Sequence, residues 1–429
     1  MNEYRSLELP RKSNKKKEDY KYFVGSTEKD PLSYKAGETM VFKIRAKYMD
    51  DFLSVPYIWY SLETEDGQKE EGHKVAAADG WFYIEASISK NGFVYLKAKA
   101  CDENKQILTD IEEYNGSAGA NVSEILRATK TPIDYAAFWS ANRKKVATTE
   151  PQVLFCERIE DASHPDFEIY DMRIKAAESE YASFILSYPK GAKKGSLKLA
   201  MLFQGYGVNP ATPWPMDGYL TAHVCAHSMP NGESEEFYQS LRDGALKRYG
   251  FNDEENKSGE TTYFVKMILR DLQVLHFLEN HELLNGKDYI FVGSSQGGMQ
   301  ACNLAAQFEK ATAVIMNVPG FSDVMGDLLA GRRKNAMPKG DGVAYYDTAV
   351  AAQLLKCPAY IIAGLGDPLC NASTEMALFN AIPSQKYIEF YQNKIHSFTI
   401  PWDNLRSALG DESLAKRYTE LTDMYYNFN

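Results

Sequence analysis

Asp288-Tyr-Ile-Phe-Val-Gly-Ser-Ser-Gln-Gly-Gly298 is the stretch that decides the fold. Its apolar, β-branched and aromatic run predicts a strand that ends at Gly293, and helix-forming sequence follows from Met299. Gly293, Ser295 and Gly297 fit a Gly-x-Ser-x-Gly nucleophile elbow, because a serine on so sharp a turn needs nearly bare neighbours two positions away. The alternative is an ordinary strand–turn–helix joint with a surface serine.

Length and composition indicate a globular protein of two domains. The 429 residues exceed what one core holds, and 44% hydrophobic with 25% charged residues is typical of soluble proteins. The net charge of −10 argues against nucleic acid or an anionic membrane as partner, and no apolar window is long enough to span a bilayer. Six cysteines without a C-x-x-C pair indicate buried thiols rather than a disulfide framework.

The N-terminal region reads as a tail followed by a small all-β domain. Residues 1–19, with the basic run Arg11–Lys17, are expected to be a flexible tail. No apolar leader is present, so we expect a cytoplasmic protein, or a periplasmic or secreted one if an upstream signal peptide has been removed. Residues 20–110 predict an Ig-like β-sandwich from strand-like runs separated by turn signals: Thr39–Tyr48, Tyr57–Glu63, Trp81–Ile88 and Gly92–Ala100.

The remaining chain predicts an α/β domain. Residues 111–150 are expected to be a linker and helical lead-in, with a loop at Tyr114–Gly119 and a helix over Pro132–Thr148. In residues 151–429 strands alternate with helices, of which Thr261–Asn280 is the clearest, so we expect a mostly parallel sheet with helices on both faces. The strand-like runs are Phe167–Lys175, Ala182–Tyr188, Leu197–Phe203, Leu220–Ala226, Tyr289–Val292, Ala313–Val318, Ala359–Ala363 and Lys386–Tyr391.

Partners for Ser295 follow from chain order. A serine nucleophile needs a histidine base and an acid to orient it, and in α/β-hydrolases the order is serine, acid, histidine. His396 is the only histidine after Ser295, and it follows the last predicted strand. Asp367 is the preferred acid, because Gly364 and Gly366 permit a turn that aims it at His396. Asp323, Asp341 and Asp347 are the alternatives.

Other positions suggest how an ester would be held. The backbone N–H of Gln296 and that of Tyr206, within Gln204-Gly-Tyr-Gly207, are expected to form the oxyanion hole. Gln204, Trp214 and Met299 are candidate pocket residues. His223 with His227, and His276 with His281, fit zinc spacing poorly, and no dinucleotide fingerprint or P-loop occurs, so we predict neither metal nor cofactor.

Several motifs in one order give the chain a family resemblance. From about Pro132 to Ser397 it resembles the acetyl xylan esterase and cephalosporin-C deacetylase family, carbohydrate esterase family seven. The motifs are Thr131-Pro-Ile-Asp-Tyr-Ala-Ala-Phe-Trp139, Gln204-Gly-Tyr206, Tyr263–Leu278, Gly293-Ser-Ser-Gln-Gly-Gly298, Ala344-Tyr-Tyr-Asp347, Leu355-Lys-Cys-Pro358, Gly364-Leu-Gly-Asp367 and Ile395-His396.

The resemblance implies an α/β-hydrolase that removes acetyl or similar small acyl groups from sugars. It implies Ser295, Asp367 and His396 as the triad, with oxyanion donors at Tyr206 and Gln296. It further implies an oligosaccharide or small-molecule ester as substrate and allows a homo-oligomer. The β-sandwich resembles an extension found in some relatives.

Gln204-Gly-Tyr206 stands where the family usually has His-Gly-Tyr. Two departures from the family pattern bear on substrate preference. Cys225-Ala-His-Ser-Met-Pro230 stands where the family has Arg-Gly-Gln, and Ser397 stands in place of a glutamate. Ester hydrolysis remains the expectation, but the acetyl-sugar preference stays open. An esterase or peptidase for another acyl substrate, such as a feruloyl ester or a peptide, is one alternative. A non-catalytic carbohydrate-binding protein is the other.

Overall fold

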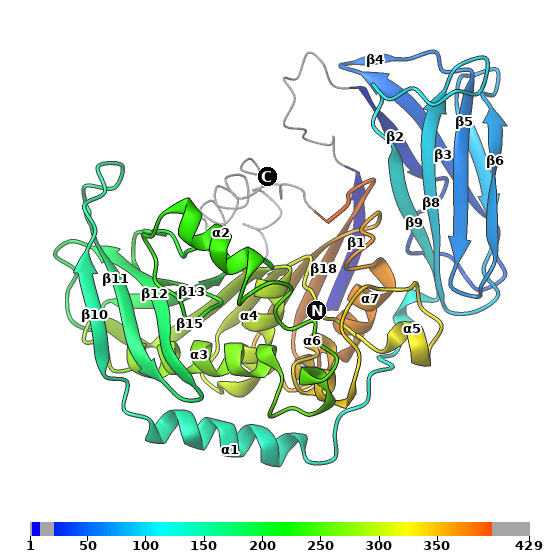
Figure 1. Cartoon of the computed structure of the whole chain (residues 1–429). Coiled ribbons are helices and arrows are strands. Elements are labelled where there is room, and N and C mark those ends of the chain that lie inside the picture. Colours follow the sequence, from blue (N-terminus) through cyan, green and yellow to red (C-terminus); the bar gives the residue numbers. More distant parts are fainter. Residues whose placement is uncertain (1, 9–20, 397–429) are drawn as a thin grey trace.

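A β-sandwich lies beside a large α/β unit in the computed structural model, which describes residues 2–8 and 21–396 (Figure 1). One sandwich sheet has β3 (Met40–Tyr48) at its centre, paired with β2 (Lys21–Thr27), β4 (Asp51–Phe52) and β7 (Phe82–Ala86). The other has the order β6 (Lys69–Val75), β5 (Tyr57–Thr64), β8 (Gly92–Cys101) and β9 (Tyr114–Ala120). Alternate residues of β3 are buried, as expected for a strand with one face on a core.

The end of the sandwich differs from the prediction. Residues Tyr114–Gly119, predicted as a loop, lie in β9 (Tyr114–Ala120), an edge strand that pairs antiparallel with β8. The Ala118 and Ala120 side chains are buried in the sandwich core. Small residues do not exclude a strand when its neighbour supplies the large apolar side chains, so the sandwich extends past the predicted boundary at residue 110.

A ten-stranded sheet forms the centre of the α/β unit. It runs parallel from β14 through β13 to β18 and β1, while β10, β11 and β12 are antiparallel, and this confirms the expected mostly parallel sheet. In spatial order the strands are β1 (Asn2–Glu8), β18 (Lys386–Gln392), β17 (Ala359–Gly364), β16 (Ala313–Asn317), β15 (Leu284–Ser294), β13 (Leu197–Phe203), β14 (Tyr219–Val224), β12 (Ser179–Pro189), β11 (Phe167–Ala176) and β10 (Val153–Arg158).

The first strand overturns one expectation. Residues 2–8, predicted as part of a flexible tail, form β1, which pairs in parallel with β18 from Asn2 opposite Lys386 to Glu8 opposite Gln392. The rest of that predicted tail lies outside the described residues. Residues 2–8 therefore lie in the sheet of the α/β unit, and the chain then passes into the sandwich and returns to the α/β unit (Figure 1).

Helices connect the strands of the large sheet. Helix α3 packs on β11 and β12, and α4 packs on β13, β15 and β16. No helix among the described residues has the length and apolar character needed to cross a membrane. The helices are α1 (Tyr135–Thr148), α2 (Glu235–Asp243), α3 (Tyr263–Leu278), α4 (Gln296–Gln307), α5 (Gly326–Leu329), α6 (Thr348–Ala352) and α7 (Ala372–Ala381), with short 3₁₀ helices η2 (Val122–Glu124), η3 (Glu255–Lys257) and η4 (Asp341–Tyr345).

Candidate active site

Ser295 lies on a strained turn between β15 and α4. Its backbone has φ 55° and ψ −116°, a conformation that L-residues rarely adopt and that is kept where the surroundings enforce it. A Cβ on Gly293 would lie 1.9 Å from the Gly297 carbonyl oxygen, and one on Gly297 would lie 1.9 Å from that of Phe203. The steric demand inferred from the sequence is therefore present, and the turn is an elbow.

Ser295, His396 and Asp367 form one chain of hydrogen bonds. The His396 Nε2 lies 2.8 Å from the Ser295 Oγ, and its Nδ1 lies 2.8 Å from the Asp367 Oδ2. Asp367 is fully buried, and its Oδ1 accepts the backbone N–H groups of Leu369 and Cys370 at 2.8 and 3.0 Å. These bonds fix the carboxylate, and the carboxylate in turn fixes the imidazole.

Asp367 also raises the pKa of His396. Burial by itself would lower the pKa of His396, but the negative charge of Asp367 and its hydrogen bond raise that pKa above the ordinary 6.5. The Asp367 contact also leaves the proton of a neutral imidazole on Nδ1, so that Nε2 is free to accept the Ser295 proton. This is the arrangement that a general base requires.

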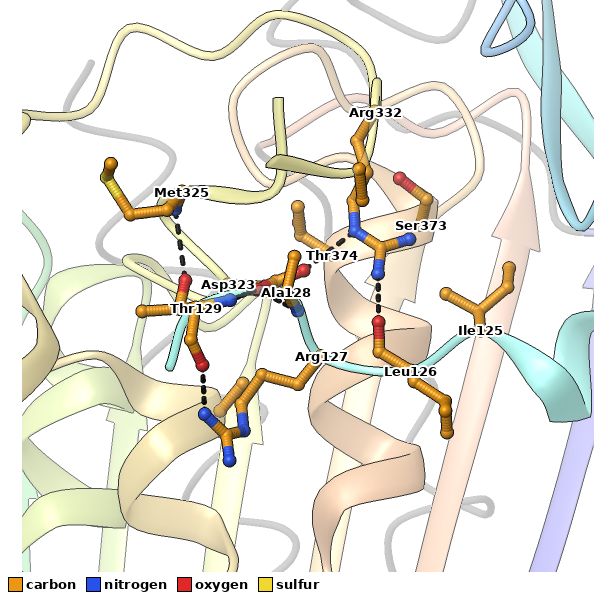
Figure 2. A network of polar contacts seen from close by, with 12 residues as sticks. Ile125, Leu126, Arg127, Ala128, Thr129, Asp323, Met325, Arg332, Ser373 and Thr374 are labelled. Carbon is orange, nitrogen blue, oxygen red and sulfur yellow. Dashed lines mark hydrogen bonds and ion pairs between the residues drawn. The ribbon is translucent and has the colours of Figure 1, made fainter. Parts of the chain in front are cut away.

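Asp323, the fallback acid, serves the structure instead (Figure 2). It forms a buried ion pair with Arg332, with 2.7 Å between the Arg332 Nε and the Asp323 Oδ2. Its Oδ1 accepts the backbone N–H groups of Ala128 and Thr129 at 2.8 and 2.7 Å. Asp323 therefore ties the segment between the sandwich and α1 to the loop after β16.

The other two alternative acids are also accounted for. Asp347 caps α6 by accepting the N–H groups of Ala349 and Val350, and it also accepts that of Val324 at 2.7 Å. Asp341 is exposed at the start of η4. Of the four aspartates considered, Asp367 is the one that contacts His396.

The two expected oxyanion donors lie near the elbow. Gln296 is the first residue of α4, so its N–H is among those that lack a partner within the helix. Tyr206 lies in the loop after β13, and the end of β13 touches the elbow through the close approach of Gly297 to Phe203. The donor roles of Tyr206 and Gln296 stay predictions.

A hydrogen-bond network that the sequence did not suggest holds the Tyr206 loop. The Gly207 N–H donates to the Tyr249 hydroxyl at 3.0 Å, and that hydroxyl donates to the Gln296 Oε1 at 2.7 Å. The Tyr206 ring stacks on the Tyr249 ring at 4.3 Å. Tyr249 therefore connects the loop of one expected oxyanion donor to the side chain of the other.

His227 supports the same loop from its other side. Its Nε2 donates to the Gly207 carbonyl oxygen at 2.9 Å, and its Nδ1 accepts the Tyr263 hydroxyl at 2.7 Å. Burial lowers the pKa of His227 to about 3, so the ring is neutral and both nitrogens are satisfied. His227 stands in the segment that departs from the family pattern, which is why no motif pointed to it.

Two of the three pocket predictions are wrong. Trp214 and Met299 have no exposed surface: Trp214 lies in the same buried cluster as the sheet residues Leu202 and Val292, and Met299 lies in the main core. Neither can line an open pocket. The Gln204 side chain donates to the Asn209 carbonyl oxygen at 2.8 Å, which closes its own loop, and a part for it in the pocket stays a prediction.

A small cavity lies between the loops that follow β16 and β17. Its volume is about 10 Å³, room for about one water molecule, and Pro319, Phe321, Leu369 and Cys370 are among its lining residues. The neighbouring Gly320 N–H donates to the Ser295 carbonyl oxygen at 2.8 Å, so the cavity adjoins the elbow.

Potential metal ligands gather at one place in the described chain. Asp367, Cys370 and His396 have ligand atoms within 4.8 Å of one another. The Asp367 and His396 atoms already hydrogen-bond to each other, and Cys370 is buried with its pKa raised well above 9 by burial, which disfavours the thiolate that binds metal. The donors present therefore fit a hydrogen-bonded pair better than a cation.

Comparison with known proteins places this site in a family. The acetyl xylan esterase (AXE1) family model matches residues 120–326 and 330–408. The acetyl esterase Axe7A of Xylanibacter ruminicola is 27% identical over 281 residues, which cover 60% of this chain and 62% of that protein. The chain thus matches somewhat less than two thirds of that curated relative.

Solved structures agree on the fold. The acetyl xylan esterase from Paenibacillus sp. R4 has a TM-score of 0.55 at 16% identity and covers 66% of this chain and 95% of its own. Acetyl xylan esterase 1 from Thermoanaerobacterium sp. JW/SL YS485 has a TM-score of 0.53 at 18% identity, with 69% and 98% covered. The fold is that of α/β-hydrolase esterases, and the family model extends over most of the chain. The chain belongs to the acetyl xylan esterase family.

Proposed function

We propose that the protein is a serine esterase that removes acetyl or similarly small acyl groups from sugars, such as acetylated xylo-oligosaccharides. The observation that carries the proposal is the chain of contacts from the Ser295 Oγ through His396 to Asp367, both at 2.8 Å, on a strained elbow. A serine hydroxyl becomes a nucleophile when an oriented base can take its proton.

In the first half-reaction the Ser295 Oγ attacks the ester carbonyl carbon while the His396 Nε2 takes the hydroxyl proton. Asp367 stabilises the resulting imidazolium. The oxyanion accepts the backbone N–H groups of Tyr206 and Gln296, each of which would lower the barrier by roughly 2.7–4 kcal/mol. His396 then gives its proton to the sugar oxygen, which leaves as an alcohol.

In the second half-reaction water replaces the sugar. His396 takes a proton from the water as its oxygen attacks the acyl carbon, and the same two N–H groups hold the second oxyanion. Collapse of this intermediate releases the carboxylic acid and returns the proton to the Ser295 Oγ.

The relatives support a small acyl group. The chain belongs to the acetyl xylan esterase family, and the 27% identical relative is named as an acetyl esterase. We therefore expect acetate esters to be preferred over long-chain and feruloyl esters.

The test compares wild type with Ser295→Ala on p-nitrophenyl esters of increasing chain length and on acetylated xylo-oligosaccharides. We expect kcat/KM to fall at least about 10³-fold in the variant, with unchanged circular dichroism. Wild-type activity no higher than that of Ser295→Ala would overturn the proposal. Cleavage of feruloyl esters or peptides in preference to acetates would leave the serine chemistry and overturn the substrate class.

A further inference from the structure

Two side chains just before His396 bind the sandwich rather than the α/β unit. Strand β18 ends at Gln392, and His396 follows four residues later. Gln392 and Asn393 are buried, with 2% and 7% exposure. Both carry amides that must find partners inside the protein, and both find them across the boundary with the sandwich.

Gln392 pairs with a peptide group of β9. Its Oε1 accepts the Ser117 N–H at 3.1 Å, and its Nε2 donates to the Ser117 carbonyl oxygen at 3.0 Å. The Nε2 also lies 3.2 Å from the Ser26 Oγ of β2. The amide thus makes the contacts that another strand would make with this edge.

Asn393 repeats this contact one step along the edge. Its Oδ1 accepts the Asn115 N–H at 3.0 Å, and its Nδ2 donates to the Phe23 carbonyl oxygen of β2 at 2.8 Å. Asn115 and Ser117 are two residues apart, so their N–H groups point to the same edge of β9. Asn393 has φ 53°, a left-handed conformation that asparagine tolerates better than most residues.

The same edge also touches the loop of Asp367. A Cβ on Gly366 would lie 2.1 Å from the Asn115 carbonyl oxygen, so the two backbones are in direct contact. The Gly366 N–H donates to the Lys394 carbonyl oxygen at 2.9 Å, which joins the Asp367 loop to the His396 loop. The loop of Asp367 and the loop of His396 therefore both lie against the edge of β9.

We infer that the sandwich is a working part of the catalytic centre, and that Gln392 and Asn393 are positioning residues which hold His396 in line with Ser295 and Asp367. The inference rests on the proposed function for the chemistry that is positioned. It assigns the sandwich a role other than carbohydrate binding. The backbone groups at the edge of β9 and in β2 bind Gln392 and Asn393 and so fix the position of the loop that carries His396. Misplacing a catalytic group by about 1 Å can cost roughly 10²-fold in rate.

The test uses the full chain with Gln392→Ala and Asn393→Gly, the latter chosen because glycine keeps the left-handed backbone. We expect kcat to fall about 10- to 100-fold with KM within about threefold, because the pocket is untouched while the base moves. Asn380→Ala is the matched control: its Nδ2 donates to the Val122 and Ile125 carbonyl oxygens, both at 2.9 Å, just after β9. It removes a similar buried side-chain-to-backbone contact, here between α7 and the segment that follows the sandwich, away from His396, and its kcat should stay within about twofold of wild type.

A second readout is independent of turnover. The Nδ1–H proton of His396, hydrogen-bonded to Asp367, should give a far-downfield proton resonance in wild type and in Asn380→Ala. It should shift or broaden in Gln392→Ala and Asn393→Gly. An unchanged resonance in both variants, or an equal loss of kcat in Asn380→Ala, would overturn the inference. A wild type without esterase activity would overturn the proposed function. The proton resonance would still test whether Gln392 and Asn393 position His396.

Discussion

Replacing Tyr249 with phenylalanine removes one oxygen atom from beneath the Tyr206 loop. The ring stays, and with it the stacking on Tyr206. The Gly207 N–H loses its acceptor at 3.0 Å, and the Gln296 Oε1 loses its donor at 2.7 Å. Two lost hydrogen bonds at about 0.5–1.5 kcal/mol each predict a loss of about 1–3 kcal/mol in the free energy of unfolding.

The catalytic effect of Tyr249→Phe should exceed what this stability loss implies. A complete oxyanion donor contributes roughly 2.7–4 kcal/mol, or 10²–10³ in rate. The variant loosens the Tyr206 N–H without removing it, so we expect kcat to fall about 10- to 100-fold with KM nearly unchanged. Steady-state hydrolysis of p-nitrophenyl acetate measures kcat and KM, and urea unfolding measures the free energy of unfolding.

Tyr238→Phe provides the matched control. The buried Tyr238 hydroxyl accepts the Glu233 N–H and donates to the Pro230 carbonyl oxygen, both at 3.1 Å, so the same kind of bridge is lost away from the site. Its stability should fall comparably while kcat stays within about twofold. The reasoning is refuted if Tyr249→Phe keeps its kcat, or if Tyr238→Phe loses as much.

Three further predictions concern the acid, the buried histidines and the elbow. Asp367→Asn should lower kcat about 10⁴-fold, and because Asp367 holds the His396 pKa above 6.5, the wild-type kcat/KM should rise with pH through a midpoint above 6.5 that moves lower in the variant. Burial lowers the pKa of His227 to about 3 and of His223 to about 4, so the unfolded state binds more protons between those values and about 6.5. Stability to urea should therefore fall on acidification below about pH 6.5, by up to about 1.4 kcal/mol per pH unit for each histidine, and less steeply in His227→Gln. Gly297→Ala, whose Cβ would meet a carbonyl oxygen at 1.9 Å, should lose activity and shift the urea midpoint downward, and a fully active, equally stable variant would contradict the elbow geometry.

Much of the fold could be predicted because the order of apolar and polar residues in many of its strands reflects which of their faces are buried. The interior strands of the large sheet are apolar runs, and β3 of the sandwich alternates, so both stand out from the loops. Strands β6 and β10 were missed because they are exposed almost throughout and show no alternation. For an edge strand the neighbouring strand, not its own sequence, decides the structure.

The elbow and the contacts among Ser295, Asp367 and His396 could be predicted for a different reason. Strained backbone at Ser295 demands glycine nearby, and the scarcity of histidine left His396 as one candidate. Tyr249 and His227 could not be found in this way. Each contacts Gly207 in the Tyr206 loop only because the fold brings distant parts of the chain together, and no local sequence pattern marks either residue. Trp214 was misassigned because an aromatic residue in a loop reads the same whether it lines a pocket or fills a core.

Strand β1 has a consequence for how the chain is made. Asn2 and its partner Lys386 are 384 positions apart, so Asn2 leaves the ribosome long before Lys386 does. At about 5–20 residues per second, roughly 20 to 80 s pass before the two can meet. Until then the edge of the sheet that β1 covers does not exist, so residues 2–8 are made long before their pairing strand. Removing these residues would leave the edge of β18 open to pairing with a second molecule.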